Sequence, residues 1–164
     1  MLKNIKQKLV SPVLMWLIVV IGFAIIFQTI PARFVFPRSI FLEALIFPAG
    51  IYWLYFFFGA LAVHHKAPLS ADKINKLVTG GVYAQVRHPI YSADIFLGWA
   101  IFFFYPDVRF LVGAHWMMFV LLFWMRREEQ ALMEKFGEEY LIYRQQVPKI
   151  FPNFRKIIGK NRKS

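Results

Sequence analysis

The chain has 164 residues, of which 59% are hydrophobic and 19% are aromatic, and its mean hydropathy is +0.49. Soluble globular domains average about 45–50% apolar residues, so this composition indicates a membrane protein. The chain has no cysteine, which excludes disulfides, cysteine-based metal sites and a thiol nucleophile.

Four long apolar runs predict an all-α integral membrane protein with four transmembrane helices, folded as a single domain. The runs cover residues 10–30, 44–63, 90–105 and 110–125. The first two reach the length of about 20 residues that a helix needs to cross a bilayer. The last two cover about 24 Å each, and the short turn between them predicts an antiparallel helical hairpin.

The first apolar run follows Lys3, Lys6 and Lys8, a basic start that a secretory signal peptide also has. A signal peptide has an apolar region of about 7–15 residues, followed by a small-residue cleavage site. Because the run is longer and no such site follows it, we expect a helix that stays in the protein.

The formal charge of +11 would fit a nucleic-acid-binding protein, but the charges follow a membrane topology. With the N-terminus inside, the outside loops hold three of the 20 Lys and Arg residues, and the inside segments hold the other 17. This asymmetry obeys the positive-inside rule and predicts a multi-pass protein with both termini in the cytoplasm. We expect the excess charge to attract anionic membrane lipids, and we expect no nucleic-acid partner.

Residues 126–148 are amphipathic and predict a C-terminal cytoplasmic helix with a bend at Gly137. One stripe of this helix combines residues spaced three or four apart: Glu128, Leu132, Phe136, Tyr140 and Tyr143. The opposite face is expected to hold Glu129, Lys135, Glu138 and Glu139. Glu128 is therefore expected to face protein and to need Arg87, His88 or a bound cation as its partner. This pairing fits either a binding site or a structural ion pair.

The most polar segment between the apolar runs is residues 77–91, LVTGGVYAQVRHPIY. Pro89 disfavours helix at the residue before it and is well placed as the first residue of a helix. Arg87 and His88 are therefore expected at the N-terminus of the third span, where unpaired amides and the helix dipole favour an anion. Lipid phosphate is the simpler candidate for this anion, and a cofactor carboxylate is the other. The two tyrosines of the segment can offer their ring faces to a cation.

The four histidines, His64, His65, His88 and His115, share no helix face that collects three ligands, so no metal site is expected. Asp94 is an ionisable residue inside the third span, which makes it a functional candidate. It also lies close enough to the start of the span to reach the membrane interface, so both interpretations stay open.

Two blocks of the sequence resemble the isoprenylcysteine carboxyl methyltransferase family and the related phospholipid methyltransferases. LVTGGVYAQVRHPIYSA resembles the family pattern LVTSGxYxxxRHPxY, and EEQALMEKFGEEYLIYRQQVP resembles EExxLxxxFGxxYxxYxxxVP. Together they span residues 77–148 in the family's order, with a helical hairpin between them. Members of this family are integral-membrane enzymes that use S-adenosylmethionine.

The resemblance implies nine cofactor-binding positions: Lys76, Leu77, Val78, Tyr83, His88, Pro89, Ile90, Tyr91 and Glu128. In the prenylcysteine branch, an arginine one turn before the glutamate holds the substrate carboxylate, and here that position is Trp124. Arg126 and Arg127 are the nearest arginines, and together with Glu128 they are the expected catalytic residues. The glycine that usually follows HPxYx in the family is Ala93.

The resemblance thus implies a methyltransferase that uses S-adenosylmethionine to O-methylate a carboxylate of a lipophilic, isoprenylcysteine-like acceptor. A carboxylate is ionised at neutral pH and needs alignment with the cofactor more than it needs a base. One alternative is N- or S-methylation of a phospholipid amine or a small thiol, for which His88 or Glu128 would remove a proton. Another alternative is a non-catalytic membrane scaffold or transporter subunit, which would not need Tyr83, His88 and Glu128 together.

Overall fold

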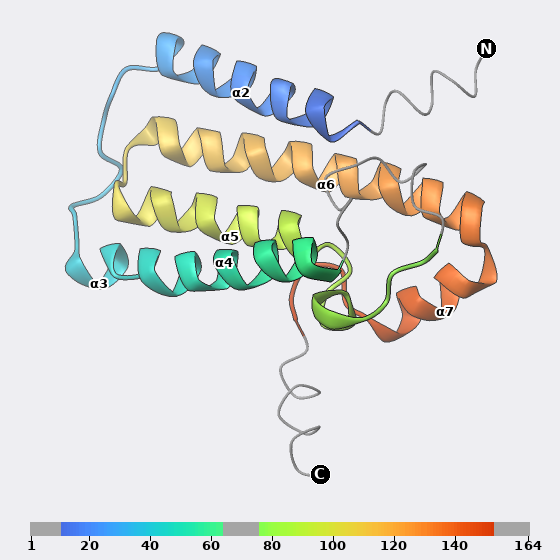
Figure 1. The fold of residues 1–164 in the computed structure, drawn as a ribbon. Coiled ribbons are helices and arrows are strands. Elements are labelled where there is room, and N and C mark those ends of the chain that lie inside the picture. The colour runs from blue at the N-terminus through green and yellow to red at the C-terminus, as the bar shows by residue number, and fades with distance from the viewer. Residues whose placement is uncertain (1–10, 64–75, 153–164) are drawn as a thin grey trace.

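The computed structural model describes residues 11–63 and 76–152, and all of its regular elements are helical (Figure 1). In chain order they are α2 (Pro12–Thr29), α3 (Ile40–Glu43), α4 (Ile46–Val63), the 3-10 helix η2 (Gly81–Ala84), α5 (Pro89–Phe104), α6 (Val108–Phe136) and α7 (Glu138–Gln146). The lysines of residues 1–10, His64, His65 and the tail after residue 152 lie outside the described residues.

Three helical stretches are long and apolar enough to cross a membrane: Pro12–Thr29, Ile40–Val63 and Val108–Phe136, with 18, 24 and 29 residues. The prediction of an all-helical integral membrane protein is confirmed at this level. α5 has 16 residues, or about 24 Å of helix against an apolar bilayer core of about 30 Å. The fourth span therefore stays a prediction, as does the orientation of the termini.

The four long helices lie side by side in the order α2, α6, α5, α4 (Figure 1). α5 and α6 form the predicted antiparallel hairpin. In the turn between them, Asp107 is the N-cap of α6. Its carboxylate accepts hydrogen bonds from the backbone amide of Arg109 at 2.9 Å and from the Nε of Arg109 at 2.8 Å. An isolated antiparallel bridge between Phe34 and Asp107 ties the connection after α2 to the same turn.

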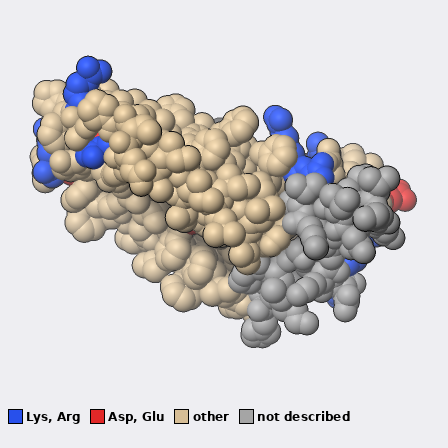
Figure 2. Space-filling view, turned by 90° about the horizontal axis from the view of Figure 1, so that it is seen from above, with Lys and Arg blue, Asp and Glu red and all other residues tan. Residues whose placement is uncertain are grey.

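The outer helices of the bundle leave most of their apolar surface uncovered. The buried residues of α2 are Met15, Val19 and Ile26, and those of α4 are Phe56 and Ala60. Seen from above, the surface is made mostly of uncharged residues, with Lys and Arg gathered toward its two ends (Figure 2). Because soluble monomers rarely expose apolar patches of this extent, the uncovered faces of α2 and α4 are assigned to lipid.

Two glycines bring α2 and α6 close together. A Cβ atom added at Gly22 would collide with the side chain of Trp116, and one added at Gly113 would collide with the ring of Phe23. Small residues allow this close approach of helices inside a membrane, where van der Waals packing replaces the hydrophobic effect as the driving force.

α6 continues far beyond the end of the predicted span at residue 125. It ends at Gly137, which has a φ of +52° and whose amide donates to the carbonyl of Met133 at 3.0 Å. A positive φ is readily adopted by glycine, and the bend predicted there is present. The amphipathic segment is therefore not one separate helix, because its first half extends α6 and its second half is the 9-residue α7.

Candidate functional site

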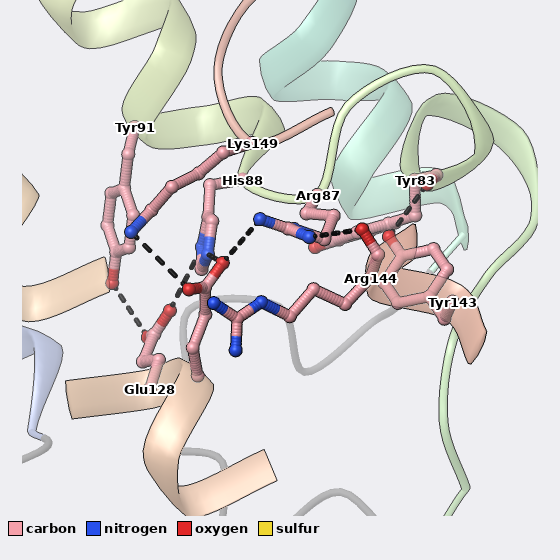
Figure 3. Close-up of polar contacts among 9 residues, drawn as sticks. Tyr83, Arg87, His88, Tyr91, Glu128, Tyr143, Arg144 and Lys149 are labelled. Carbon is pink, nitrogen blue, oxygen red and sulfur yellow. Dashed lines mark hydrogen bonds and ion pairs between the residues drawn. The ribbon is translucent and has the colours of Figure 1, made fainter. Parts of the chain in front are cut away.

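Three segments that are distant in the sequence meet at one end of the bundle: residues 76–91, the part of α6 after residue 125, and residues 138–151 (Figures 1 and 3). Pro89 is the first residue of α5, and His88 is its N-cap. This start places His88 and Tyr91 one turn apart, with their rings stacked at a centroid distance of 5.8 Å. Both side chains point toward the acidic residues of α6 (Figure 3).

Glu128 receives two partners from the start of α5. The hydroxyl of Tyr91 donates to its Oε1 at 2.8 Å, and the Nδ1 of His88 lies 3.5 Å from its Oε2. The residues that the two sequence blocks single out are thus in contact, although 37 positions separate Tyr91 from Glu128. These contacts fix both the position and the orientation of the carboxylate.

The expectation that Glu129 lies on the face opposite Glu128 is wrong, because both carboxylates lie beside His88. The exposed fraction of Glu129 is 8%. Its Oε1 lies 3.0 Å from the Nη2 of Arg87 and 3.3 Å from the Nε2 of His88, and its Oε2 lies 3.4 Å from the Nζ of Lys149. Three cationic groups from two other segments surround this carboxylate. Other segments therefore cover more of the surface of α6 than the predicted stripe of Glu128, Leu132 and Phe136. The sequence signal was its adjacency to Glu128, because neighbouring helix positions are only about 100° apart.

His88 lies between the two carboxylates of α6. Burial disfavours the charged imidazolium, but hydrogen bonds and charge interactions with Glu128 and Glu129 outweigh this effect and raise the pKa of His88. The protonated ring has a donor on each nitrogen. It can therefore satisfy Glu128 through Nδ1 and Glu129 through Nε2 at the same time.

The C-terminal segment, residues 147–152, covers the start of α5. The backbone amide of Arg87 donates to the carbonyl of Pro148 at 2.9 Å, and that of His88 donates to the carbonyl of Lys149 at 3.3 Å. The hydroxyl of Ser92 donates to the carbonyl of Ile150 at 2.7 Å. The amides of Arg87 and His88 therefore pair with the C-terminal segment, while the anion site predicted at the first amides of α5 itself stays a prediction.

Residues of α7 hold the loop that precedes α5. The hydroxyl of Tyr143 donates to the carbonyl of Tyr83 at 2.7 Å, and the Nη1 of Arg87 donates to the carbonyl of Arg144 at 2.7 Å. Burial, and to a lesser degree the charge of Glu128, raises the pKa of Tyr83. Its phenol is therefore neutral at physiological pH.

A cavity of about 670 Å³ adjoins this cluster, which is within the usual range of about 300–1,000 Å³ for ligand sites. Its polar end is formed by Arg87, His88, Tyr91 and Glu128. Most of its other lining residues are apolar, and those from α2, α4 and α7 include Val13, Trp16, Leu17, Val20, Trp53, Phe57 and Tyr140. Asp94 of α5 also lines it. The contributions of α2 and α4 have no signal in the two sequence blocks.

Eight of the nine predicted cofactor-binding residues line this cavity: Leu77, Val78, Tyr83, His88, Pro89, Ile90, Tyr91 and Glu128. The ninth, Lys76, is exposed and does not line it. Arg126 is exposed, and neither Arg126 nor Arg127 lines the cavity. Trp124 is buried in the bundle core, and its Nε1 has no hydrogen-bond partner. Among residues 11–63 and 76–152, no group of three or more His, Asp or Glu side chains is placed to hold a metal ion.

Three membrane-length helices, and a cavity with a charged end at one end of the bundle, define an integral-membrane helical bundle. The family model for phospholipid methyltransferases matches residues 39–139. The chain belongs to this family.

Curated relatives that match the chain are named protein-S-isoprenylcysteine O-methyltransferase. The relative from Schizosaccharomyces pombe is 37% identical over 96 residues, which cover 54% of this chain and 38% of the relative. The human relative is 38% identical and the mouse relative 32% identical, each over 95 residues that cover 54% of this chain and 32% of the relative. The match thus covers about a third of the length of these relatives, and it confirms the resemblance seen in the two sequence blocks. No solved structure gives a significant match to this chain.

Proposed function

We propose that this protein is an S-adenosylmethionine-dependent methyltransferase of the membrane, which O-methylates a carboxylate on a lipophilic, isoprenylcysteine-like acceptor. The observation that carries the proposal is the cavity, in which the charged cluster of His88, Tyr91 and Glu128 continues directly into apolar walls from α2 and α4. A water-soluble cofactor suits the first part, and a lipid-like acceptor suits the second. The names of the relatives support this choice of acceptor.

The charged end has the groups that a zwitterionic cofactor requires. Arg87 and His88 supply positive charge for a carboxylate, and Glu128 supplies negative charge for an ammonium or a hydroxyl group. The Nε of Arg87 is buried without a hydrogen-bond partner, so its N–H is a donor that a ligand could use. These residues fit S-adenosylmethionine, and when bound this cofactor supplies a methyl group already activated by its sulfonium.

The protein's own part in the reaction is to align the reactants and to keep water out. Tyr91 and His88 hold both oxygens of Glu128, so the carboxylate is oriented before a ligand arrives. The acceptor is proposed to enter between the apolar helices with its carboxylate toward this end. Arg126 and Arg127 are proposed to attract that carboxylate, from positions next to Glu128 on α6 but outside the cavity wall.

The test is methyl transfer from S-[methyl-³H]adenosylmethionine into a membrane lipid extract by the detergent-purified protein. We expect label in the organic phase that is released as methanol by mild base, because methyl esters hydrolyse under these conditions. Label that resists base would place the methyl group on nitrogen or sulfur and would overturn the carboxylate assignment. If the protein binds S-adenosylhomocysteine but transfers no methyl group, the proposal that it is a methyltransferase is contradicted.

A further inference from the structure

Asp94 is a buried acid that the proposed reaction does not use. It lies on α5 one turn after Tyr91, and its exposed fraction is 8%. Its Oδ1 accepts a hydrogen bond from the Nε1 of Trp53 at 2.7 Å. Its Oδ2 is buried and has no hydrogen-bond partner. Trp53 therefore satisfies only part of a group that can accept about four hydrogen bonds.

Asp94 also lies between two cavities. It lines the larger cavity that holds the charged cluster and a second cavity of about 280 Å³, and the two cavities share Trp16, Trp53 and Asp94. The other residues that line the smaller cavity are all apolar, and they come from α2, α5 and α6: Phe23, Leu97, Gly98, Ile101, Phe110, Ala114 and Met117. Asp94 is thus the ionisable residue placed where the polar-ended cavity meets an apolar one.

A carboxyl oxygen without a partner is costly in an apolar interior. Asp94 lies in α5, the predicted third span, and an ionisable residue inside a span is normally paired or marks a ligand path. Trp53 already links α4 to α5 through Oδ1, so a purely structural role leaves Oδ2 unexplained. A ligand that carries a hydrogen-bond donor would complete the group.

The position of Asp94 indicates that the ligand that donates to Oδ2 is the acceptor and not the cofactor. The cofactor is assigned to the end formed by His88 and Glu128, whereas Asp94 faces the apolar cavity as well. A lipophilic acceptor with its head group at the charged end and its tail in the apolar cavity would pass Asp94 between the two. A carboxylate placed directly beside Asp94 would be repelled, so the group that meets Asp94 must be a neighbouring donor.

We propose that Asp94 is an acceptor-binding residue whose carboxyl group receives a hydrogen bond from an N–H group next to the acceptor's methylated carboxylate. The inference rests on the proposed function and narrows its substrate class to acceptors that carry an amide or ammonium group beside the acid. It predicts discrimination between two otherwise similar prenylated acids.

The test compares N-acetyl-S-farnesylcysteine, which has such an N–H group, with farnesylthiopropionic acid, which lacks it. Binding of each acid to the detergent-purified protein is measured by tryptophan fluorescence, since Trp16 and Trp53 line both cavities. We expect the wild type to bind the N–H acid about tenfold more tightly, as expected for one hydrogen bond to a charged group. In Asp94→Asn this ratio should fall to about threefold or less, with the affinity for S-adenosylhomocysteine unchanged.

Trp53→Phe is the matched variant, because it removes the donor to Oδ1 and keeps the acid. It should retain most of the discrimination between the two acids, with Trp16 as the remaining reporter. If Trp53→Phe loses the discrimination between the two acids as Asp94→Asn does, the Trp53–Asp94 pair is structural and the proposal is overturned. A loss of S-adenosylhomocysteine affinity in Asp94→Asn would instead assign Asp94 to the cofactor and would also overturn it.

The wild-type ratio decides the inference even if Asp94→Asn does not fold, because equal affinities for the two acids contradict it. If the acids bind but neither is methylated, the proposed carboxylate chemistry is contradicted. The role of Asp94 is then still decided by the ratio of the two affinities. If neither acid binds while S-adenosylhomocysteine does, both the acceptor class and the role of Asp94 are wrong.

Discussion

Tyr91 on the first turn of α5 donates a hydrogen bond to Glu128 on α6 at 2.8 Å. This contact joins the two sequence blocks of the family pattern, and both residues line the same cavity. It holds the carboxylate that is proposed to bind the cofactor.

Tyr91→Phe should weaken the binding of S-adenosylhomocysteine about tenfold, because it removes one hydrogen bond to a charged group and keeps the ring. Isothermal titration calorimetry measures the effect. Tyr105→Phe is the control, since Tyr105 lies at the far end of α5, where it packs against Phe34. An unchanged affinity in Tyr91→Phe would show that the orientation of Glu128 does not matter for binding.

Glu129→Gln should destabilise the protein more than any other single acid-to-amide change on α6. It leaves Arg87, His88 and Lys149 without their common carboxylate, and the loss of one partner of a buried ion pair costs about 3–5 kcal/mol. The measurement is the thermal midpoint in detergent, with Glu134→Gln as the control because Glu134 is exposed on the same helix. Equal midpoints for the two variants would refute the structural role of Glu129.

Stability should fall as the pH rises above the unfolded pKa of His88, about 6.5. The pKa of His88 is raised above 6.5 by Glu128 and Glu129 despite its burial, so the folded state holds this proton more tightly than the unfolded state does. The resulting stabilisation is complete below the unfolded pKa of about 6.5 and is lost as the pH rises through the higher folded value. Thermal midpoints measured from about pH 6 to 9 should show this loss in the wild type and a smaller one in His88→Gln. The same pH slope in both proteins would assign the effect to other groups.

Arg126→Gln and Arg127→Gln test the proposed attraction of the acceptor carboxylate. Combined in one protein, they should raise the KM for N-acetyl-S-farnesylcysteine several-fold, because the two arginines are proposed to attract its carboxylate from outside the cavity. The binding of S-adenosylhomocysteine should be unchanged, because the cofactor is assigned to the end formed by His88 and Glu128. Methyl-transfer kinetics with increasing acceptor concentration provide the measurement. Unaltered kinetics would remove both arginines from the mechanism.

Local signals predicted much of the fold. Charge-free runs marked α2 and α4, Pro89 marked the start of α5, and Gly137 marked the bend between α6 and α7. These features depend on neighbouring residues alone, through helix length, the fixed φ of proline and the freedom of glycine.

Only the site residues that lie in the two sequence blocks resembling the family could be predicted. The burial of Glu129 and the pairing of the Arg87 and His88 amides both depend on residues 147–152, which fold back over the start of α5. The cavity walls from α2 and α4 also depend on packing between distant segments. A pattern of spacing along one helix cannot show which other segments will cover it.

The central claim is that Glu128 belongs to a cofactor site at the end of the bundle, and calorimetric titration of S-adenosylhomocysteine tests it most directly. The account predicts that the wild type and Glu134→Gln bind with the same affinity, and that Glu128→Gln binds about tenfold or more weakly. Equal affinities in all three proteins, or no binding to the folded wild type, would contradict it.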